Sequence, residues 1–155
     1  MRLSATFFLV AAFVALSAAC AQGTLPGPAP AETATSARSA LSTAIKAYES
    51  GQAERLISQL DGAMIGYGAY TESIRRDAAQ LKQIRVQLLD TTVTAGDNIV
   101  YVSSAWEKRF VTANALKPQL HKGRTTFAMR PSGGDWRISG IAGDNLFSTP
   151  VVTTP

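Results

Sequence analysis

The C-terminal half of the chain contains four apolar segments separated by short turns, and this pattern limits the possible fold most strongly. The segments cover residues 85–94, 99–111, 121–130 and 136–142. The turn sequences at 95–98 and 131–135 are AGDN and PSGGD, which are typical of hairpin turns. Because short connections place consecutive strands side by side, we expect a four-stranded antiparallel meander.

Alternate residues of a strand point to the same face of the sheet. In the second strand the even positions are mostly apolar and include Trp106, but Lys108 interrupts the pattern. In the third strand Phe127 lies on the apolar face, and His121 has the same parity. We expect Trp106, Phe127 and Trp136 to contribute to the core. We also expect the side chains of residues 136–142 to alternate between the two faces of the sheet without interruption.

Three helical segments are predicted before the strands. The first covers Ser36–Ser50, with Thr35 or Ser36 as its cap and Gly51 as its end. Its apolar residues recur at spacings of three and four: Ala37, Leu41, Ala44, Ile45 and Tyr48. Helices followed by a meander of strands indicate the α+β class.

The second predicted helix covers residues 52–60, and the segment 62–70 is expected to be irregular, possessing three glycines and two tyrosines. The third helix is predicted to begin after Thr71 as its N-cap. Ile74, Ala78 and Leu81 form its apolar stripe. Residues 75–77, Arg-Arg-Asp, lie off that stripe and are expected on a solvated face.

The first 19 residues have the features of a secretory signal: a basic residue, Arg2, then an apolar run and small residues. The sequence Leu-Ser-Ala-Ala-Cys at 16–20 resembles the end of a bacterial lipoprotein signal, although leucine stands four rather than three places before Cys20. That resemblance implies lipidation of Cys20 and an outer-membrane protein facing the periplasm. The alternative is ordinary cleavage after Ala21, which would discard Cys20 and give a soluble periplasmic or secreted protein.

The predicted organisation is therefore a signal peptide (1–19), Cys20 with a flexible linker (20–35), one domain (36–147) and a disordered tail (148–155). The linker is rich in proline and glycine and has no apolar periodicity. It is expected to act as a tether between membrane and domain.

The composition excludes several classes of protein. Cys20 is the single cysteine, so an internal disulfide is impossible. One histidine and this cysteine do not indicate a transition-metal site, and no phosphate-binding glycine loop is present. The formal charge is +4 and the basic residues are scattered, which does not indicate a nucleic-acid partner. We expect no cofactor.

The order of elements resembles the nuclear-transport-factor-2-like superfamily, also called SnoaL-like. Three passages carry the resemblance: YESG at 48–51, GDNIVYV at 96–102 leading into Trp106, and GGDWRI at 133–138 followed by Gly-Asp at 143–144. The resemblance implies a cone: a strongly curved sheet wrapped around helices, with a pocket at its open end. Many members dimerise through the outer sheet face, and the superfamily includes isomerases, dehydratases and members without activity, so the fold does not decide the function.

Candidate site residues follow from that resemblance, because the enzymes of the superfamily use acid–base groups in the pocket. Asp90 and His121 are the catalytic candidates, each with a structural alternative, Asp90 at the rim of the sheet and His121 at the start of a strand. The candidate ligand-binding residues are aromatic and polar side chains near the expected pocket: Tyr67, Tyr70, Trp106, His121 and Phe127.

The sequence favours a membrane-tethered binding or interaction module of the cell envelope, with a small apolar ligand and without catalysis. Two alternatives stay open. One is an isomerase or dehydratase that uses Asp90 or His121. The other is a structural homodimer with a filled pocket. A homodimer or an envelope protein is also an expected partner of the binding module.

Overall fold

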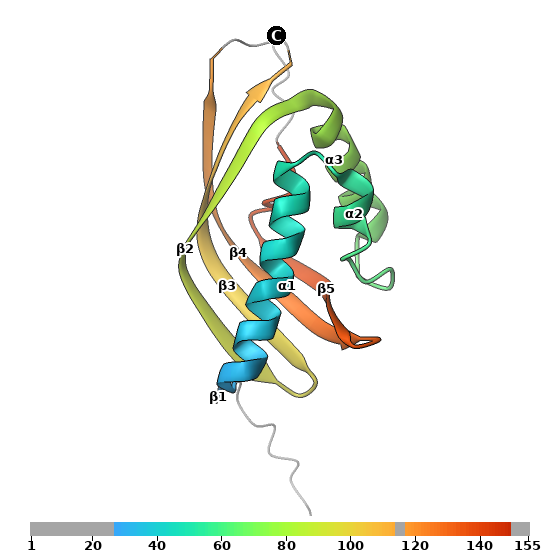
Figure 1. Cartoon of the computed structure of the whole chain (residues 1–155), viewed down its shortest axis with the longest axis vertical. Helices are drawn as coiled ribbons and strands as arrows, with labels where there is room; N and C mark the ends of the chain where they lie inside the picture. The colour runs from blue at the N-terminus through green and yellow to red at the C-terminus, as the bar shows by residue number, and fades with distance from the viewer. Residues whose placement is uncertain (1–26, 114–116, 150–155) are drawn as a thin grey trace, which may run out of the picture.

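A computed structural model describes residues 27–113 and 117–149. It consists of one curved antiparallel sheet with three helices on its concave face (Figure 1). The predicted signal peptide and Cys20 lie outside the described residues. No helix in the described ranges is long and apolar enough to cross a membrane.

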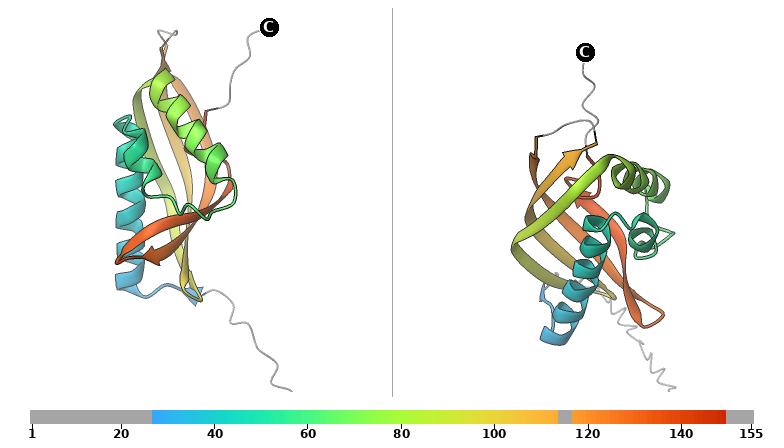
Figure 2. Two further views of the ribbon diagram at one scale, coloured as in Figure 1. Left: turned by 90° about the vertical axis from the view of Figure 1, so that its right-hand side faces the viewer. Right: turned by 45° about the horizontal axis from the view of Figure 1, so that its top comes forward.

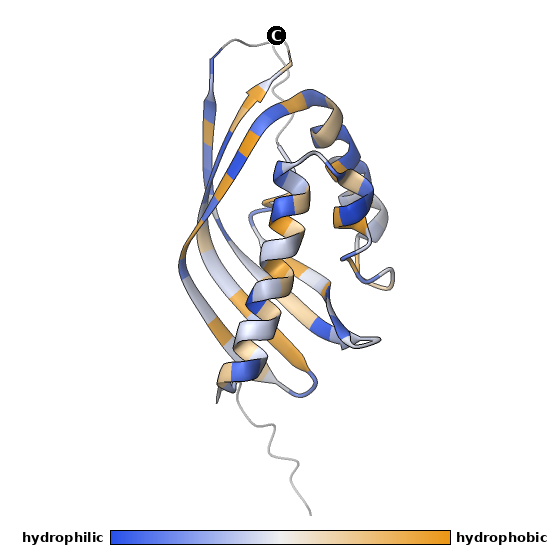
Figure 3. Cartoon of the chain, viewed as in Figure 1, coloured by the Kyte–Doolittle hydropathy of each residue, from blue (hydrophilic) through white to orange (hydrophobic). Residues whose placement is uncertain are grey.

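The sheet has the strand order β1-β2-β3-β4-β5, and all neighbours are antiparallel. The four long strands are β2 (Leu81–Gly96), β3 (Ile99–Thr112), β4 (Gln119–Ser132) and β5 (Asp135–Gly143), which confirms the predicted meander. A two-residue strand, β1 (Gly27–Pro28), was not predicted and pairs with the end of β2. Figure 3 shows apolar and polar residues alternating along the strands.

Helix α1 (Ala31–Glu49) lies along the concave face, as the two views of Figure 2 show. Its predicted apolar stripe is buried. The helix begins five residues earlier than predicted, inside the expected linker, because Pro30 rather than Thr35 or Ser36 is the N-cap. The predicted end is confirmed: Gly51 has φ 68°, and its N–H donates to Tyr48 O, which closes the last turn.

The other two helices cover the remaining part of the concave face. Helix α2 (Ala53–Ile57) is a short turn with Leu56 and Ile57 buried. Helix α3 (Tyr67–Gln80) begins four residues before the predicted cap, because Gly66 takes a left-handed conformation and starts the helix. The predicted irregular segment is therefore partly helical, and Thr71 is an interior residue that donates to Gly68 O.

Irregularities in two strands shape the sheet. In β2 the pairing shifts at two places, and Gln83 and Asp90 have positive φ values of 54° and 47° there. In β5 a further shift places Ser139 as an extra residue, so the uninterrupted alternation predicted for 136–142 is wrong. Such bulges bend a strand, which allows the sheet to curve around the helices.

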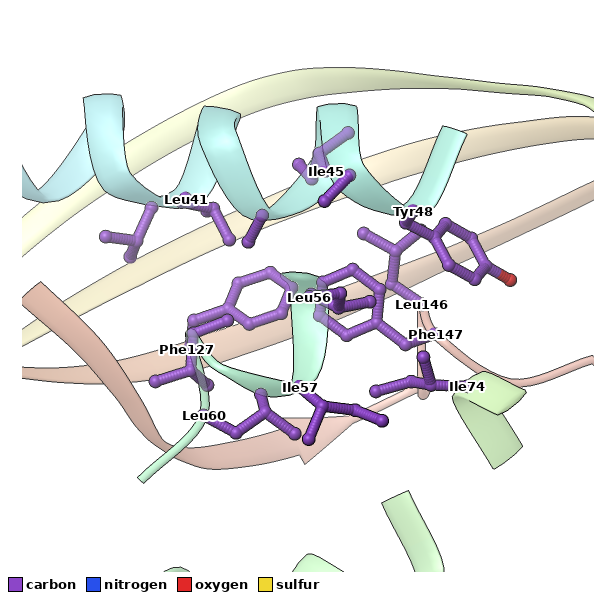
Figure 4. Packing of buried hydrophobic residues seen from close by; sticks show 14 of the residues in the cluster. Leu41, Ile45, Tyr48, Leu56, Ile57, Leu60, Ile74, Phe127, Leu146 and Phe147 are labelled. Atoms are coloured by element: carbon purple, nitrogen blue, oxygen red, sulfur yellow. The ribbon is translucent and has the colours of Figure 1, made fainter. Parts of the chain in front are cut away.

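The interior between the helices and the sheet is apolar. Phe127 and Phe147 are fully buried with ring centroids 5.8 Å apart, and Leu41, Leu56 and Leu60 pack around them (Figure 4). Tyr48 lies at one side of this group, and its hydroxyl oxygen points out of it. At the end of the sheet where β2 begins and β3 ends, the apolar core is therefore followed by buried polar side chains.

Candidate functional site

A group of buried polar side chains lies at that end of the sheet. It consists of Tyr48 from α1, Asp77 from α3, Lys108 from β3 and Thr149, and is called the Lys108 cluster below. Tyr48, Asp77 and Lys108 are 2%, 1% and 0% exposed. Buried lysines and aspartates are rare in folded proteins unless they are paired, so this cluster is the most unusual chemical feature of the fold.

Lys108 enters the interior because it follows the alternation of β3. The even positions from Val100 to Phe110 all point inward, and the lysine occupies one of them. Its Nζ lies 3.0 Å from Leu146 O, 3.1 Å from Ser148 O, 3.1 Å from the Tyr48 hydroxyl and 3.2 Å from Thr149 Oγ1. Three protons thus serve four oxygen acceptors. Burial lowers the pKa of Lys108 to about 8, although the Asp77 carboxylate opposes this shift.

Asp77 supplies the negative charge of the cluster. Its Oδ2 accepts from the Tyr48 hydroxyl at 2.6 Å and from Thr149 Oγ1 at 2.9 Å, and lies 3.9 Å from Lys108 Nζ. Both hydroxyls therefore link the ammonium to the carboxylate. Burial and the adjacent Asp77 charge raise the pKa of Tyr48 well above its ordinary value, so the phenol stays protonated and acts as a donor.

The solvated face predicted for residues 75–77 is wrong at Asp77. This residue lies three positions after Ile74, and side chains three apart share one face of a helix. Arg75 does lie on the surface, where it forms an exposed ion pair with Glu54 at 2.8 Å. Arg76 is intermediate: its side chain is 32% exposed, and its Nε lies 3.9 Å from Asp77 Oδ1.

The described chain ends in a segment, Leu146–Thr149, that closes the interior and is called the closing segment. Leu146 and Phe147 are fully buried, and the Phe147 ring meets the Tyr48 ring edge-on at 5.4 Å. Ser148 and Thr149 were predicted to belong to a disordered tail, but both are held by Lys108, and Arg76 Nη2 donates to Ser148 Oγ at 3.3 Å. The rest of the predicted tail, 150–155, lies outside the described residues.

Beside the closing segment is a hollow of about 520 Å³, called the mouth pocket. Its lining comes from β3, the start of β4 and the residues after β5: Trp106, Leu120, His121, Lys122, Asp144, Asn145 and Ser148. A second hollow, of about 550 Å³, follows the outer side of α1 and includes Trp136. The two tryptophans of the chain thus line different hollows.

The Trp106 indole is fixed by its neighbours on β4. Its Nε1 donates to Thr125 Oγ1 at 2.7 Å, and Thr125 Oγ1 donates to Asp144 O. Gly123 leaves the room for the ring, because a Cβ at this position would lie 2.4 Å from Trp106 Cζ2. The pocket therefore has a rigid aromatic wall.

His121 is the direct cross-strand partner of Lys108. Its ring meets the Phe110 ring edge-on with centroids 4.9 Å apart. Burial lowers the pKa of His121, and the positive charge of Lys108 lowers it further. The imidazole is therefore neutral at pH 7 and presents one donor and one acceptor.

The structure brings two of the predicted site residues together, since Trp106 and His121 both line the mouth pocket. Phe127 is fully buried in the apolar core. Tyr67 and Tyr70 lie in the first turn of α3, where the Tyr70 hydroxyl donates to Ile141 O at 3.3 Å. Their assignment to ligand binding stays a prediction.

Asp90, the predicted candidate base, is exposed at the second irregularity of β2. It is absent from the lining of the mouth pocket, so it does not share that hollow with His121.

The sequence analysis did not identify Lys108, Asp77 and Tyr48 as one cluster. The available signals were the inward parity of Lys108 and the helical spacing between Ile74 and Asp77. Among the described residues, no group of three or more His, Cys, Asp or Glu side chains is arranged to hold a metal ion.

The cluster and the pocket have different chemical capacities. In the described chain every buried side-chain nitrogen or oxygen has a hydrogen-bond partner. The acid–base groups of the Lys108 cluster are therefore fully engaged with one another and with the closing segment. The mouth pocket has an aromatic wall, a neutral imidazole and polar groups at its rim, which suits an amphipathic molecule.

Comparisons with known proteins agree with this fold. Residues 33–142 match the model of a family described as SnoaL-like domain. No curated protein matches this chain.

Among solved structures, a putative scytalone dehydratase from Novosphingobium aromaticivorans is similar, with a TM-score of 0.65 and 8% identity over 74% of this chain and 85% of its own. A nuclear-transport-factor-2-like superfamily protein from Salmonella enterica has a TM-score of 0.61 and 13% identity, covering 79% and 99%. Bd1075 of Bdellovibrio bacteriovorus has a TM-score of 0.56 and 14% identity over 67% of this chain, which spans 38% of its length. At these identities the likeness shows the fold alone.

Proposed function

The chain belongs to the SnoaL-like domain family, and from that premise we propose that it is a non-catalytic binding module of the bacterial cell envelope. The module takes a small amphipathic ligand in the mouth pocket and is held at the membrane by a lipid on Cys20. One observation supports this proposal above the others. The accessible hollow is lined by Trp106 and His121, whereas the acid–base groups of the fold are sealed behind the closing segment.

The pocket part of the proposal can be tested with the amphipathic dye 1-anilinonaphthalene-8-sulfonate. A Trp136→Phe variant keeps Trp106 as its single tryptophan, so energy transfer from the indole to bound dye reports on the mouth pocket. We expect saturable transfer in this variant, and weaker transfer when Leu120→Asp is added. Saturable transfer that persists only in a Trp106→Phe variant, which keeps Trp136, would place the dye in the hollow along α1 and overturn the proposal.

The membrane part rests on the sequence of residues 16–20 and requires its own measurement. The intact mass of protein purified from envelope membranes, beside a Cys20→Ala variant, decides it. A chain that begins at Cys20 with added acyl mass, lost in the variant, supports the tether. A soluble chain that begins at Gln22 without added mass contradicts it and leaves a free periplasmic or secreted binding protein.

A second candidate function is that of an isomerase or dehydratase, whose acid–base groups would be those of the Lys108 cluster rather than the predicted Asp90 or His121. If the closing segment moved, Asp77 would be a base, and Lys108 and Tyr48 would be donors for a developing oxyanion. The assay is conversion of a β,γ-unsaturated ketone to its conjugated isomer, followed by the absorbance of the product. If the natural chain converts the ketone and Asp77→Asn does not, the protein is an enzyme of this kind and not a non-catalytic binding module.

A further inference from the structure

We propose that the mouth pocket continues inward to Lys108 and Arg76 when Ser148 and Thr149 move aside, and that this inner part binds the carboxylate of an amphipathic ligand. The inference rests on the proposed function, because it names the head group of the ligand that the mouth pocket would take. The apolar part of that ligand would lie against Trp106 and Leu120 in the pocket.

The first argument is that two cations converge on the same two residues. Lys108 Nζ donates to Ser148 O at 3.1 Å and to Thr149 Oγ1 at 3.2 Å. Arg76 Nη2 donates to Ser148 Oγ at 3.3 Å and to Thr149 O at 3.5 Å. A lysine and an arginine therefore point at a small volume that is filled with oxygen atoms of the chain itself. All of those oxygens are uncharged, whereas a carboxylate would form charge-assisted bonds with the same donors.

The second argument is the charge of the site. Lys108 and Arg76 contribute two positive charges, and Asp77, which lies 3.9 Å from each of them, contributes one negative charge. His121 opposite Lys108 is neutral at pH 7 for the reason given above. One positive charge is thus left without a paired anion at the edge of the cluster, where the Arg76 side chain is 32% exposed. A ligand with a single negative charge would balance it.

The third argument is that Ser148 separates the two spaces. Ser148 lines the mouth pocket and also contacts Arg76 and Lys108. Leu146 and Phe147 are fully buried and hold their part of the closing segment in the core, whereas Ser148 is half-buried. Movement of Ser148 and Thr149 alone would therefore join the pocket to the Lys108 cluster and leave the apolar core intact.

The experiment uses two probes that differ only in the head group, octanoate and octan-1-ol. Their affinities are measured by titration calorimetry for the full chain and for a chain that ends at Phe147 as an amide, so that no new terminal carboxylate lies beside Lys108. We expect the shortened chain to bind octanoate about tenfold more tightly than the full chain, since one charge-assisted bond has about that value. Octan-1-ol should bind both chains alike, and Lys108→Met in the shortened chain should remove the gain for octanoate.

Equal affinity of the two chains for octanoate, or an equal gain for octan-1-ol, would overturn the inference. If octan-1-ol binds and octanoate gains nothing, the inference fails while the proposed mouth pocket stands. If neither probe binds either chain, the proposed pocket itself fails.

A variant of full length covers the case in which the shortened chain does not fold. Thr149→Val keeps the shape of the side chain but removes the hydroxyl between Lys108 and Asp77. This change loosens the end of the closing segment and should raise the affinity for octanoate by about threefold, because both hydrogen bonds of the Thr149 hydroxyl are lost. Ser139→Ala, which removes a hydroxyl contact to Ala128 O on β4, is the matched control and should leave the affinity unchanged.

Discussion

The two ends of the inner sheet face are built from the same strands by opposite means. At the end where β3 begins, Val102 of β3 stands opposite Phe127 of β4, and both are fully buried. At the end where β3 finishes, Lys108 stands opposite His121 on the same two strands. The first, apolar end is stabilised by removal of apolar surface from water, and the second, polar end by hydrogen bonds between its polar groups.

This difference determines which kinds of substitution each end tolerates. An apolar interior responds to changes in volume, because cavities and overpacking both cost stability. A buried polar cluster responds to changes in charge and hydrogen bonding, even when the volume is kept. The predictions below test this contrast, beginning with the largest expected effect.

Phe127→Ala tests the apolar end. The side chain is fully buried beside Phe147, so its removal leaves a cavity. We expect the free energy of unfolding in urea to fall by about 4 kcal/mol. Leu120→Ala on the same strand is the control, because Leu120 is 46% exposed and should change stability by less than about 0.5 kcal/mol. A loss below about 1 kcal/mol for Phe127→Ala would mean that this end is not closely packed.

Asp77→Leu tests the polar end with little change in volume. Lys108 would keep its buried charge and lose the carboxylate 3.9 Å away, so we expect a loss of about 3 kcal/mol in urea unfolding. Met129→Leu at the apolar end is the matched control, with a loss below about 1.5 kcal/mol.

The double variant Lys108→Met, Asp77→Leu should be more stable than the sum of the two single changes predicts, by about 1 kcal/mol or more. Additive losses would show that the two charges do not interact, and the contrast between the two ends would then lose its electrostatic basis.

Gly123→Ala tests the wall between the strands and the mouth pocket. The new Cβ would lie 2.4 Å from Trp106 Cζ2 and 2.8 Å from Asp144 Cβ, so the indole must move. We expect a loss of about 2 kcal/mol and a shifted emission of Trp106 in a Trp136→Phe background. Gly140→Ala is the control, because its Cβ would meet only Ala128 Cβ at 3.4 Å. An unchanged emission spectrum would contradict the tight contact.

The smallest expected effect is a dependence of stability on pH. The pKa of Lys108 is lowered to about 8 in the folded chain, so between pH 8 and the ordinary lysine value the unfolded chain binds more protons. Stability due to Lys108 should therefore rise with pH in that window, by about 1–2 kcal/mol between pH 7.5 and 9.5.

Above pH 10 the raised pKa of Tyr48 acts in the other direction, because the protonated phenol is favoured only in the folded chain. Urea unfolding at several pH values measures the rise, and Lys108→Met should lack it. If the Lys108→Met variant shows the same rise of stability with pH as the natural chain, Lys108 is not the group that causes it.

Much of the sheet could be predicted because strand signals are local. Turn residues at 95–98 and 131–135 gave the hairpins, and alternation gave the inner positions of β3 and β4. The starts of α1 and α3 were wrong, since Pro30 and Gly66 set them through backbone conformation rather than through apolar spacing. The alternation in β5 failed at Ser139, because a bulge depends on the partner strand.

The positions of only some candidate residues could be predicted, because a bulge depends on the pairing with the neighbouring strand. Parity placed Trp106 and His121 on the inner face, and the structure places both at one pocket. The side chains of β2 alternate as expected up to Leu88, but the irregularity at Leu89–Thr92 turns the Asp90 side chain to the surface. A single inserted residue reverses the face of a side chain, and the sequence alone does not reveal such a shift.

The sequence by itself determined the α+β class, the order of the strands and the inner face of β3, since these depend on turns and on a period of two residues. Only the tertiary structure decided what Lys108 meets. Its partners Tyr48 and Thr149 lie 60 and 41 residues away along the chain, and Asp77 bonds to a hydroxyl 72 residues away. A buried charge requires partners from several elements at once, and contacts of that kind form only when the helices and the closing segment pack on the sheet.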